Sequence, residues 1–402
     1  MRHSMASNVS RRFASVVLLG TVAAGGCSAG GGAGSSLPGG RSVAPAAARA
    51  SRGTVGLGVV LATKNNGQIF GFDIDQNGSD GVLATAANVE TFNEDTGQIS
   101  KSIPQKTPAG TSYGMDGIFG SDVGLITRYV VPKGSIYAKR YYNVMSPVTK
   151  GKFDAKWKPP IPDVDVQQGG ANQSTSTSVL FAIELKNQDK PDLFVTNIAT
   201  NTVSKVIHLN PNEFGLAYGP QLGQYTSANE AVIAYSPDGG AAGGVAPVNA
   251  IFNLQTGQET QFNGYNNGPY HAGDVNGLAV DPNTGIAATT TELNAQVEFY
   301  DLNKKIGIAA VQLPCTNNAD QTFSGSGVAV DPVNKLFIVS EQYYCEQNQG
   351  SALVIYDEQG NLVETITGFT FSIGEPAAVI NPGKRMGWTF GPHFDQLQQF
   401  FY

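Results

Sequence analysis

The sequence predicts an all-β protein, a seven-bladed β-propeller with four-stranded antiparallel blades, and three observations predict it. A six-residue phrase occurs twice in the sequence, as GLAVDP from Gly277 and as GVAVDP from Gly327. Pro282, Pro332 and Pro382 follow one another at intervals of fifty residues. The repeated unit reads as strands and turns, and no long segment shows helical periodicity. A strand-built repeat of this length is typical of propellers, in which each repeat is one blade.

One repeat, from 327 to 369, accounts for all four strands of a blade. Its runs rich in apolar and β-branched residues are, in order, GVAVDP, KLFIVSE, ALVIYDEQ and NLVETITGF. Turn-forming combinations, Asp-Pro, Asn-Lys and Gln-Gly-Asn, mark the connections within it. Short apolar runs bounded by such turns predict antiparallel strands.

The hairpin between the third and fourth strands recurs more widely than the opening phrase. Each copy has a β-branched or aromatic run, then Asp or Asn, a short polar turn and a second β-branched run. Alternation of period two within the runs is typical of half-buried strands. The copies are Val89–Ile103, Leu193–Ile207, Ala250–Phe262, Val297–Val311 and Leu353–Ile366.

The two ends of the repeat region complement each other. The C-terminus supplies three strands, in PAAVINP, KRMGWTFG and DQLQQFFY, and Thr54–Thr63 is a spare strand near the N-terminus. We expect them to share one blade, because joining first and last strands closes the ring and removes an exposed edge. From Arg52 to Tyr402 there are 351 residues, about seven repeats of fifty. Six or eight blades stay open as alternatives, since residues 110–168 divide poorly into strands.

Parts of the chain resemble known propeller families. LFVTNIATNTVSKVI, which contains Phe194-Val195-Thr196-Asn197, resembles the YVTN-type repeat, although His208 stands where that repeat usually has Asp. The GxAVDP phrases are similar to NHL and SMP-30/lactonase-like propellers. The resemblance implies the fold more than the function, because propellers include enzymes, binding proteins and scaffolds.

The N-terminus has the pattern of a secretory signal over residues 1–26. Arg2, Arg11 and Arg12 precede the apolar run 13–24, which is followed by small residues. At Cys27 the pattern resembles a bacterial lipobox, which implies a lipidated Cys27 at the mature N-terminus. The alternative is an ordinary signal with an incidental cysteine. Residues 27–51, rich in Gly, Ser and Ala, predict a flexible tether, and residues 52–402 the propeller.

The cysteines and the net charge limit the cellular compartments and the kinds of partner that we expect for the protein. If Cys27 carries lipid, Cys315 and Cys345 remain as a pair, and in an exported protein we expect a disulfide between them. Two free thiols are the alternative. Without the three signal arginines the charge is 22 − 32 = −10, from 25 basic and 32 acidic residues. Nucleic acid is therefore not an expected partner.

The segment FDIDQNGSDG, 72–81, is a candidate calcium site. Asp73, Asp75 and Asn77 place oxygen donors two residues apart, and Ca²⁺ takes six to eight oxygen ligands. The segment resembles the calcium hairpins of integrin-type propeller blades, although Gly81 stands where a further carboxylate is expected. The alternative is a polar hairpin bent at Asn77-Gly78.

A second candidate site lies where loops lead into the innermost strands, at the mouth of the central channel. His271, Asp274, Asn276 and Glu375 are its candidate catalytic residues, with Glu230 expected in the same belt. Carboxylates and amides converging on the axis would hold a metal that activates water, as in lactonase-like propellers. The alternative is a solvated polar funnel.

No complete catalytic set can be assembled from these residues. We therefore expect an exported, lipid-anchored, non-catalytic binding or scaffold module at the cell envelope, on the outer-membrane or periplasmic side, or secreted. Its partner, a protein or small molecule, would bind the loop face or the central funnel, and a membrane only through the lipid. The alternatives are a metal-dependent lactonase- or esterase-like hydrolase, and a dehydrogenase on a quinoprotein-like propeller.

Overall fold

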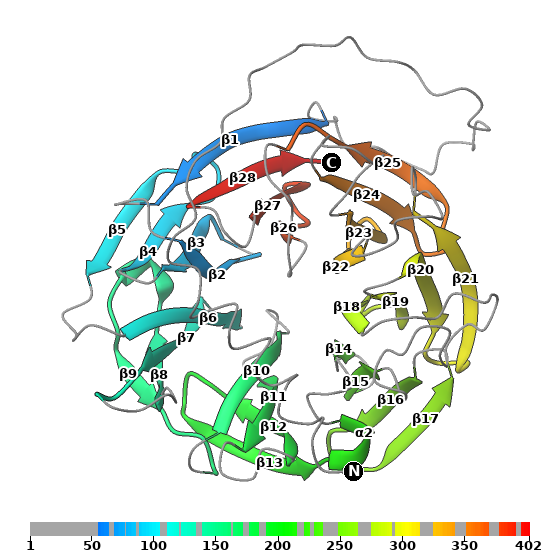
Figure 1. Cartoon of the computed structure of the whole chain (residues 1–402), viewed down its shortest axis with the longest axis horizontal. Coiled ribbons are helices and arrows are strands. Elements are labelled where there is room, and N and C mark those ends of the chain that lie inside the picture. Colours follow the sequence, from blue (N-terminus) through cyan, green and yellow to red (C-terminus); the bar gives the residue numbers. More distant parts are fainter. Residues whose placement is uncertain are drawn as a thin grey trace. The chain divides into compact units, whose positions relative to one another are not determined.

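The computed structural model is an all-β ring. Residues Gly53–Tyr402 form one compact unit, in which seven four-stranded antiparallel sheets stand as blades (Figure 1). The predicted fold class is confirmed, and six or eight blades are excluded. The structure describes residues 55–63, 68–76, 78–85, 88–104, 111–119, 122–133, 139–161, 164–171, 177–184, 190–214, 221–225, 229–235, 248–263, 275–291, 294–313, 325–341, 351–369, 378–390 and 395–402.

Blades 1 to 6 each run in chain order from the innermost to the outermost strand (Figure 1). Blade 1 holds β2 (Ile69–Ile74), β3 (Asp80–Thr85), β4 (Asn88–Asn93) and β5 (Ile99–Pro104). Blade 2 holds β6 (Thr111–Phe119), β7 (Val123–Val130), β8 (Lys139–Met145) and β9 (Ala155–Trp157). Blade 3 holds β10 (Val164–Ala171), β11 (Thr177–Glu184), β12 (Pro191–Asn197) and β13 (Thr202–His208).

The next three blades repeat the arrangement. Blade 4 holds β14 (Gln221–Tyr225), β15 (Glu230–Tyr235), β16 (Val248–Asn253) and β17 (Glu259–Asn263). Blade 5 holds β18 (Val275–Val280), β19 (Ile286–Thr291), β20 (Asn294–Asp301) and β21 (Ile306–Gln312). Blade 6 holds β22 (Gly325–Asp331), β23 (Leu336–Glu341), β24 (Ala352–Asp357) and β25 (Leu362–Ile366). All five hairpins predicted between third and fourth strands are confirmed.

Helix is confined to two short pieces of the described chain, η2 (Val148–Lys150) and α2 (Pro211–Phe214). No helix in the described ranges is both long enough and apolar enough to cross a bilayer.

Blade 7 closes the ring with strands from both ends of the chain. β26 (Val379–Asn381), β27 (Met386–Phe390) and β28 (Gln396–Phe401) are joined by β1 (Gly56–Ala62), which pairs antiparallel with β28 as the outermost strand. The predicted closure is confirmed. β28 thereby gains an outer partner strand, with one irregularity between Leu57 and Val60, and is not left as the edge of its blade.

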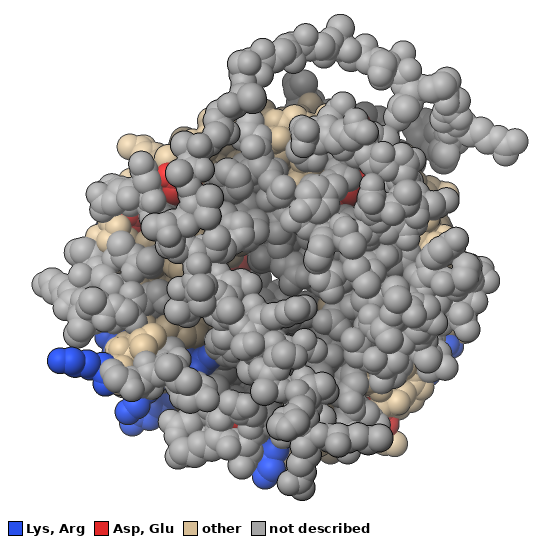
Figure 2. All heavy atoms as spheres, viewed as in Figure 1, with Lys and Arg blue, Asp and Glu red and all other residues tan. Residues whose placement is uncertain are grey.

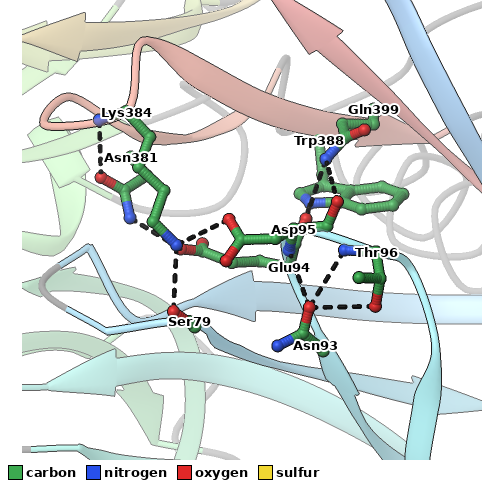
Figure 3. Close-up of polar contacts among 9 residues, drawn as sticks. All are labelled: Ser79, Asn93, Glu94, Asp95, Thr96, Asn381, Lys384, Trp388 and Gln399. Carbon is green, nitrogen blue, oxygen red and sulfur yellow. Dashed lines mark hydrogen bonds and ion pairs between the residues drawn. The ribbon is translucent and has the colours of Figure 1, made fainter.

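A polar cluster fastens blade 7 to blade 1 (Figure 3). Glu94, in the turn after β4, is fully buried. Its Oε1 accepts hydrogen bonds at 2.7 Å from Lys384 Nζ and at 2.7 Å from Asn381 Nδ2. Trp388 Nε1 donates to the Glu94 carbonyl at 3.1 Å. A buried carboxylate is costly unless it is paired. The donors from blade 7 therefore stabilise Glu94 only when blades 7 and 1 are correctly joined.

The core lies between blades, where facing sheets bury alternate side chains. Between blades 5 and 6 it is made by one face of each sheet: Ala279, Ala288, Val297, Phe299, Leu313, Phe337, Val339, Ala352, Val354 and Tyr356. The opposite face of blade 6 packs on blade 7. Both faces of a blade are therefore apolar, which explains the near-continuous apolar runs of the sequence.

The glycine of the repeated phrase has a packing role. The chain has a β-bulge before Gly277 in β18 and before Gly327 in β22. A Cβ added at Gly277 would lie 2.7 Å from the Gly327 Cα and 2.7 Å from the Val328 nitrogen. Neighbouring innermost strands therefore touch backbone to backbone, and only glycine permits that approach.

Antiparallel order gives the propeller two different ends. Connections between first and second strands, and between third and fourth strands, lie at one end, which we call the turn end. Connections between second and third strands, and between blades, lie at the other, which we call the loop end. The longest intervals between strands all lie at the loop end: 209–220, 236–247, 264–274, 313–324, 342–351 and 367–378.

Candidate functional site

Asp73, the first predicted calcium ligand, joins two blades. Its Oδ1 accepts a hydrogen bond from the Ile74 N–H at 2.8 Å, and its Oδ2 accepts one from the Ile118 N–H of β6 at 2.6 Å. Burial raises the pKa of Asp73 to about 7, although both N–H donors act to lower it. The carboxylate thus already has two backbone partners, one of them in blade 2.

The rest of the predicted calcium segment forms the hairpin between β2 and β3. The Asp75 N–H donates to the Asp80 carbonyl at 2.8 Å, and the Gly78 N–H donates to the Asp75 carbonyl at 3.1 Å. Asn77 lies outside the described residues. No group of three or more His, Cys, Asp or Glu in the described ranges could hold a metal ion. Calcium at Asp73, Asp75 and Asn77 stays a prediction, which melting curves with and without EDTA would check.

The predicted residues of the channel mouth fall mostly outside the described chain. His271, Asp274 and Glu375 lie outside it, as do Cys27, Cys315 and Cys345. Asn276 belongs to β18, and the structure describes only its backbone. The hydrolase residues and the disulfide therefore stay predictions.

The expected position of Glu230 is wrong. Glu230 begins β15 and pairs with Tyr225, the last residue of β14. It therefore lies at the turn end, whereas the strand that follows Asp274 begins at the loop end. Glu230 lines a cavity of about 300 Å³ between blades 4 and 5, with Asn253, Gln258, Asn303 and Lys305 among its neighbours. Residue spacing did not show which end of its strand Glu230 occupies.

Blade 2 is basic in an otherwise acidic chain. Residues 123–162 contain eight Lys and Arg and one acidic residue, Asp154, a net charge of +7. The remaining residues contain 17 basic and 31 acidic residues, a net charge of −14. Blue side chains gather at the lower left of Figure 2, over the blade that holds β6 to β9 in Figure 1. Such a separation of charge favours an acidic partner at blade 2.

Four cations of this blade stand near its loop end, where β7 finishes and β8 starts. Lys133 and Lys139 are exposed, and Arg128 and Arg140 are partly exposed. Val131 and Tyr141 are each 38% exposed, a large value for such apolar side chains. We call Arg128, Lys133, Lys139 and Arg140, with Tyr129 and Tyr141, the basic end of blade 2.

Tyrosines hold the first arginine in place. Tyr113, Arg128 and Tyr141 lie directly opposite one another on β6, β7 and β8, and their side chains share one face. The Arg128 guanidinium lies 4.9 Å from the centre of the Tyr141 ring. Burial raises the pKa of Tyr113, and the charge of Arg128 partly offsets that rise. A guanidinium held against a ring face can still donate the N–H groups at its edge to an anion.

The other face of the sheet has the same kind of pair, but here the tyrosine is on β7 and the arginine on β8. Arg140 lies directly opposite Tyr129, and its guanidinium is 5.5 Å from the centre of that ring. Tyr129 lies over Gly114, where an added Cβ would be 3.0 Å from the ring. Two arginines are thus presented on opposite faces of one hairpin, each supported by an aromatic ring.

The outermost strand of blade 2 is too short to cover this end. β6, β7 and β8 extend to Thr111, Val130 and Lys139, whereas β9 pairs only with residues 142–144 of β8. The Lys158 N–H donates instead to Asn201 Oδ1 of blade 3 at 2.9 Å. Pro159 and Pro160 follow and have no N–H to add to a ladder. β9 therefore does not reach residues 139–141 of β8.

Sequence reasoning missed the basic end of blade 2. The region 110–168 divided poorly into strands because β9 has three residues and a bulge interrupts β6 after Met115. The net charge of the whole chain is −7, and this total hides the local excess of basic residues in blade 2. The absence of any Asp or Glu from Val123 to Phe153 was the available signal.

Comparisons with known proteins give the fold. No protein-family model matches the chain, and no curated protein sequence matches it. A chain described as "Structure of U3-55K" is similar with a TM-score of 0.60 and 12% identity, over 85% of this chain and 98% of that chain. A chain described as "Crystal structure of RRP9 WD40 repeats" is similar with a TM-score of 0.57 and 11% identity, over 85% and 96%. At such identities the likeness shows the fold alone: this chain has the β-propeller fold of these WD40-repeat structures.

Proposed function

We propose that the protein is a non-catalytic binding or scaffold module that recognises an acidic partner at the basic end of blade 2. The observation that carries this proposal is the pair of ring-supported arginines, Arg128 and Arg140, beside exposed Lys133 and Lys139 in a chain of net charge −7. Stability alone does not require such a cluster, since repulsion between neighbouring cations opposes it. Enrichment of Tyr and Arg is also typical of the energetic centres of binding surfaces.

The partner in this proposal is a protein segment rather than a nucleic acid. The surplus of +7 is confined to residues 123–162, and the rest of the chain carries −14. A long phosphate backbone would extend from blade 2 onto acidic neighbours, whereas a short acidic segment stays within the blade. WD40-repeat propellers share the fold, and the annular surface of a propeller suits such docking without a catalytic site.

A binding measurement with polyglutamate tests the proposal. We expect the full chain to bind polyglutamate with an affinity that falls as salt is raised, because salt screens exposed charges. The double variant Arg128→Ala, Arg140→Ala should bind at least tenfold more weakly. The matched control is Lys305→Gln with Lys335→Gln, two exposed cations in turns of blades 5 and 6 at the turn end. Equal weakening in both variants, or no binding by the unchanged chain, would contradict the proposal.

The proposed location is the cell envelope, with residues 1–26 as the export signal and lipid on Cys27. The support is the sequence pattern of Arg2, Arg11 and Arg12, the short apolar run and the small residues before Cys27. We expect the full chain expressed in a bacterium to partition into detergent, and Cys27→Ser to partition into the aqueous phase. Mass spectrometry of the N-terminal peptide should find the acyl mass. An unmodified cysteine there would remove the anchor from the proposal and leave the binding function untouched.

A further inference from the structure

We propose that the cavity between blades 4 and 5 binds a free aliphatic amino acid, with its ammonium group at Glu230, its carboxylate at Lys305 and its side chain on an apolar floor. The cavity has a volume of about 300 Å³ and lies at the turn end, where Glu230 begins β15 and Lys305 follows β20. This site is separate from the basic end of blade 2, so it goes beyond the proposed function and does not depend on it.

The cavity exists because a small side chain replaces a large one at one position of the repeat. In blades 4 and 7 the residue after the third strand donates its N–H to the residue before the second strand, so the two blades can be aligned. In this alignment Val232 of β15 has the position of Trp388 in β27. The fully buried Trp388 fills the space between blades 7 and 1 (Figure 3). The smaller valine leaves the corresponding space between blades 4 and 5 open.

The neighbouring blades present equivalent turns to these two spaces. Gly97 of blade 1 and Lys305 of blade 5 both have left-handed backbone conformations, with φ of 68° and 58°, in the turn after the third strand. A Cβ added at Gly97 would lie 3.1 Å from Trp388 Cη2, so no room is left between blades 7 and 1. Between blades 4 and 5 the equivalent residue is a lysine, and it lines the cavity.

The walls of the cavity carry both charges. Burial raises the pKa of Glu230, and the charge of Lys305 partly offsets that rise, so the two groups lie within electrostatic range. No ion pair joins them in the part of the chain that the structure describes. Opposite charges that face one cavity without pairing suit a ligand with both an ammonium group and a carboxylate. A ligand with only one charge would leave the other wall without its partner.

The floor of the cavity favours an aliphatic side chain. It is made by Ile251 and Leu302, both buried. The Leu302 carbonyl has the position of the Glu94 carbonyl between blades 7 and 1, which accepts hydrogen bonds there from the side chains of Trp388 at 3.1 Å and Gln399 at 2.9 Å. The apolar side chains at these two positions of blade 4 cannot donate. The Leu302 carbonyl can therefore accept a hydrogen bond from the ammonium group of the ligand.

Equilibrium dialysis of the full chain with labelled L-leucine tests the site. We expect saturable binding, with at least tenfold weaker competition by isopentylamine, which lacks the carboxylate, and by 4-methylpentanoate, which lacks the ammonium group. Glu230→Gln and Lys305→Gln should each weaken binding at least tenfold. The matched controls are Glu364→Gln and Lys335→Gln in blade 6, which should leave binding unchanged.

A second variant tests the origin of the cavity. Val232→Trp introduces the side chain found in blade 7 and should abolish the binding of L-leucine. If this variant unfolds, Glu230→Gln and Lys305→Gln still decide the question, because neither side chain is fully buried. The site is wrong if L-leucine shows no saturable binding, if both analogues compete as well as L-leucine does, or if the two charge variants bind as the unchanged chain does. The binding of polyglutamate at blade 2 is measured separately, so none of these results decides the proposed function.

Discussion

At the scale of the residue, Glu341 shows how strongly the blade interior affects one charge. It ends β23 fully buried, and neither of its carboxyl oxygens has a hydrogen-bond donor in the described chain. Burial raises the pKa of Glu341 from 4.5 to about 8. The native state therefore holds a proton that the unfolded chain releases, so this group favours folding fully below pH 4.5. That contribution is lost as the pH rises toward 8, with a slope of about 1.4 kcal/mol per pH unit at most.

We therefore expect Glu341→Gln to flatten the dependence of stability on pH. The amide cannot ionise, so the variant should gain stability over the unchanged chain as the pH rises from 5 to 8.5. Urea unfolding at a series of pH values measures this difference. Glu364→Gln on β25, the outermost strand of the same blade, serves as the control and should leave the slope unchanged. Parallel curves for Glu341→Gln and the unchanged chain would refute the assignment.

At the scale of the element, the close contact between the innermost strands β18 and β22 predicts that even an alanine at this contact lowers the free energy of unfolding. Gly277→Ala puts a methyl group 2.7 Å from the backbone of β22, and neither strand can move without disturbing its blade. We expect a loss of about 1–3 kcal/mol in the free energy of unfolding. Gly383→Ala is the matched control, because its added Cβ would meet only Asn381 Oδ1, at an ordinary 3.5 Å. A chemical unfolding experiment that finds equal losses at both positions would contradict the contact.

The strands were predictable to different degrees for physical reasons. The repeat at Gly277 and Gly327 was visible because β18 and β22 are neighbouring innermost strands with the same bulge and a close backbone contact, so both carry the same glycine. The basic blade was not resolved into strands because its fourth strand is stopped by Pro159 and Pro160 after three residues. Which face a side chain occupies depends on bulges such as the one in β6, and these do not show in an alternation pattern.

The candidate site was harder to predict than the fold. Asp73 is a predicted metal ligand because its spacing to Asp75 suits oxygen ligation. Its carboxylate also accepts two backbone hydrogen bonds, one of them from blade 2, and residue spacing along one strand does not contain that contact. The Arg128 and Arg140 pairings depend on cross-strand register, which the spacing of residues along one strand does not contain. A local charge count would have indicated the blade, and only the register indicates the site.

At the scale of the whole molecule, the ring depends on one strand from the opposite end of the chain. β1 contributes Leu61 to the core between blades 7 and 1, and Gln398 Nε2 donates to the Gly58 carbonyl at 3.1 Å. A chain beginning at Thr63 would expose β28 as an edge and open that core. We expect it to melt at a lower temperature and to aggregate.

Adding the missing strand back as a separate peptide distinguishes an open ring from a misfolded chain. The peptide GLGVVLA, which has the sequence of β1, should restore part of the lost melting temperature by pairing with β28. A scrambled peptide of the same composition is the control. If the truncated chain has the same melting temperature as the full chain, β1 contributes nothing to closure.

Closure by β1 and β28 also determines when folding can finish. β28 pairs through Phe401 with Gly56, near the start of the propeller. A ribosome therefore releases the last strand of blade 7 after all the other blades, and β1 stays without its partner until then. Contacts between residues so far apart in sequence also form slowly. A chain built in this way keeps its ring open until β28 has been made, so the last step of folding joins strands made early and late in the synthesis of the propeller.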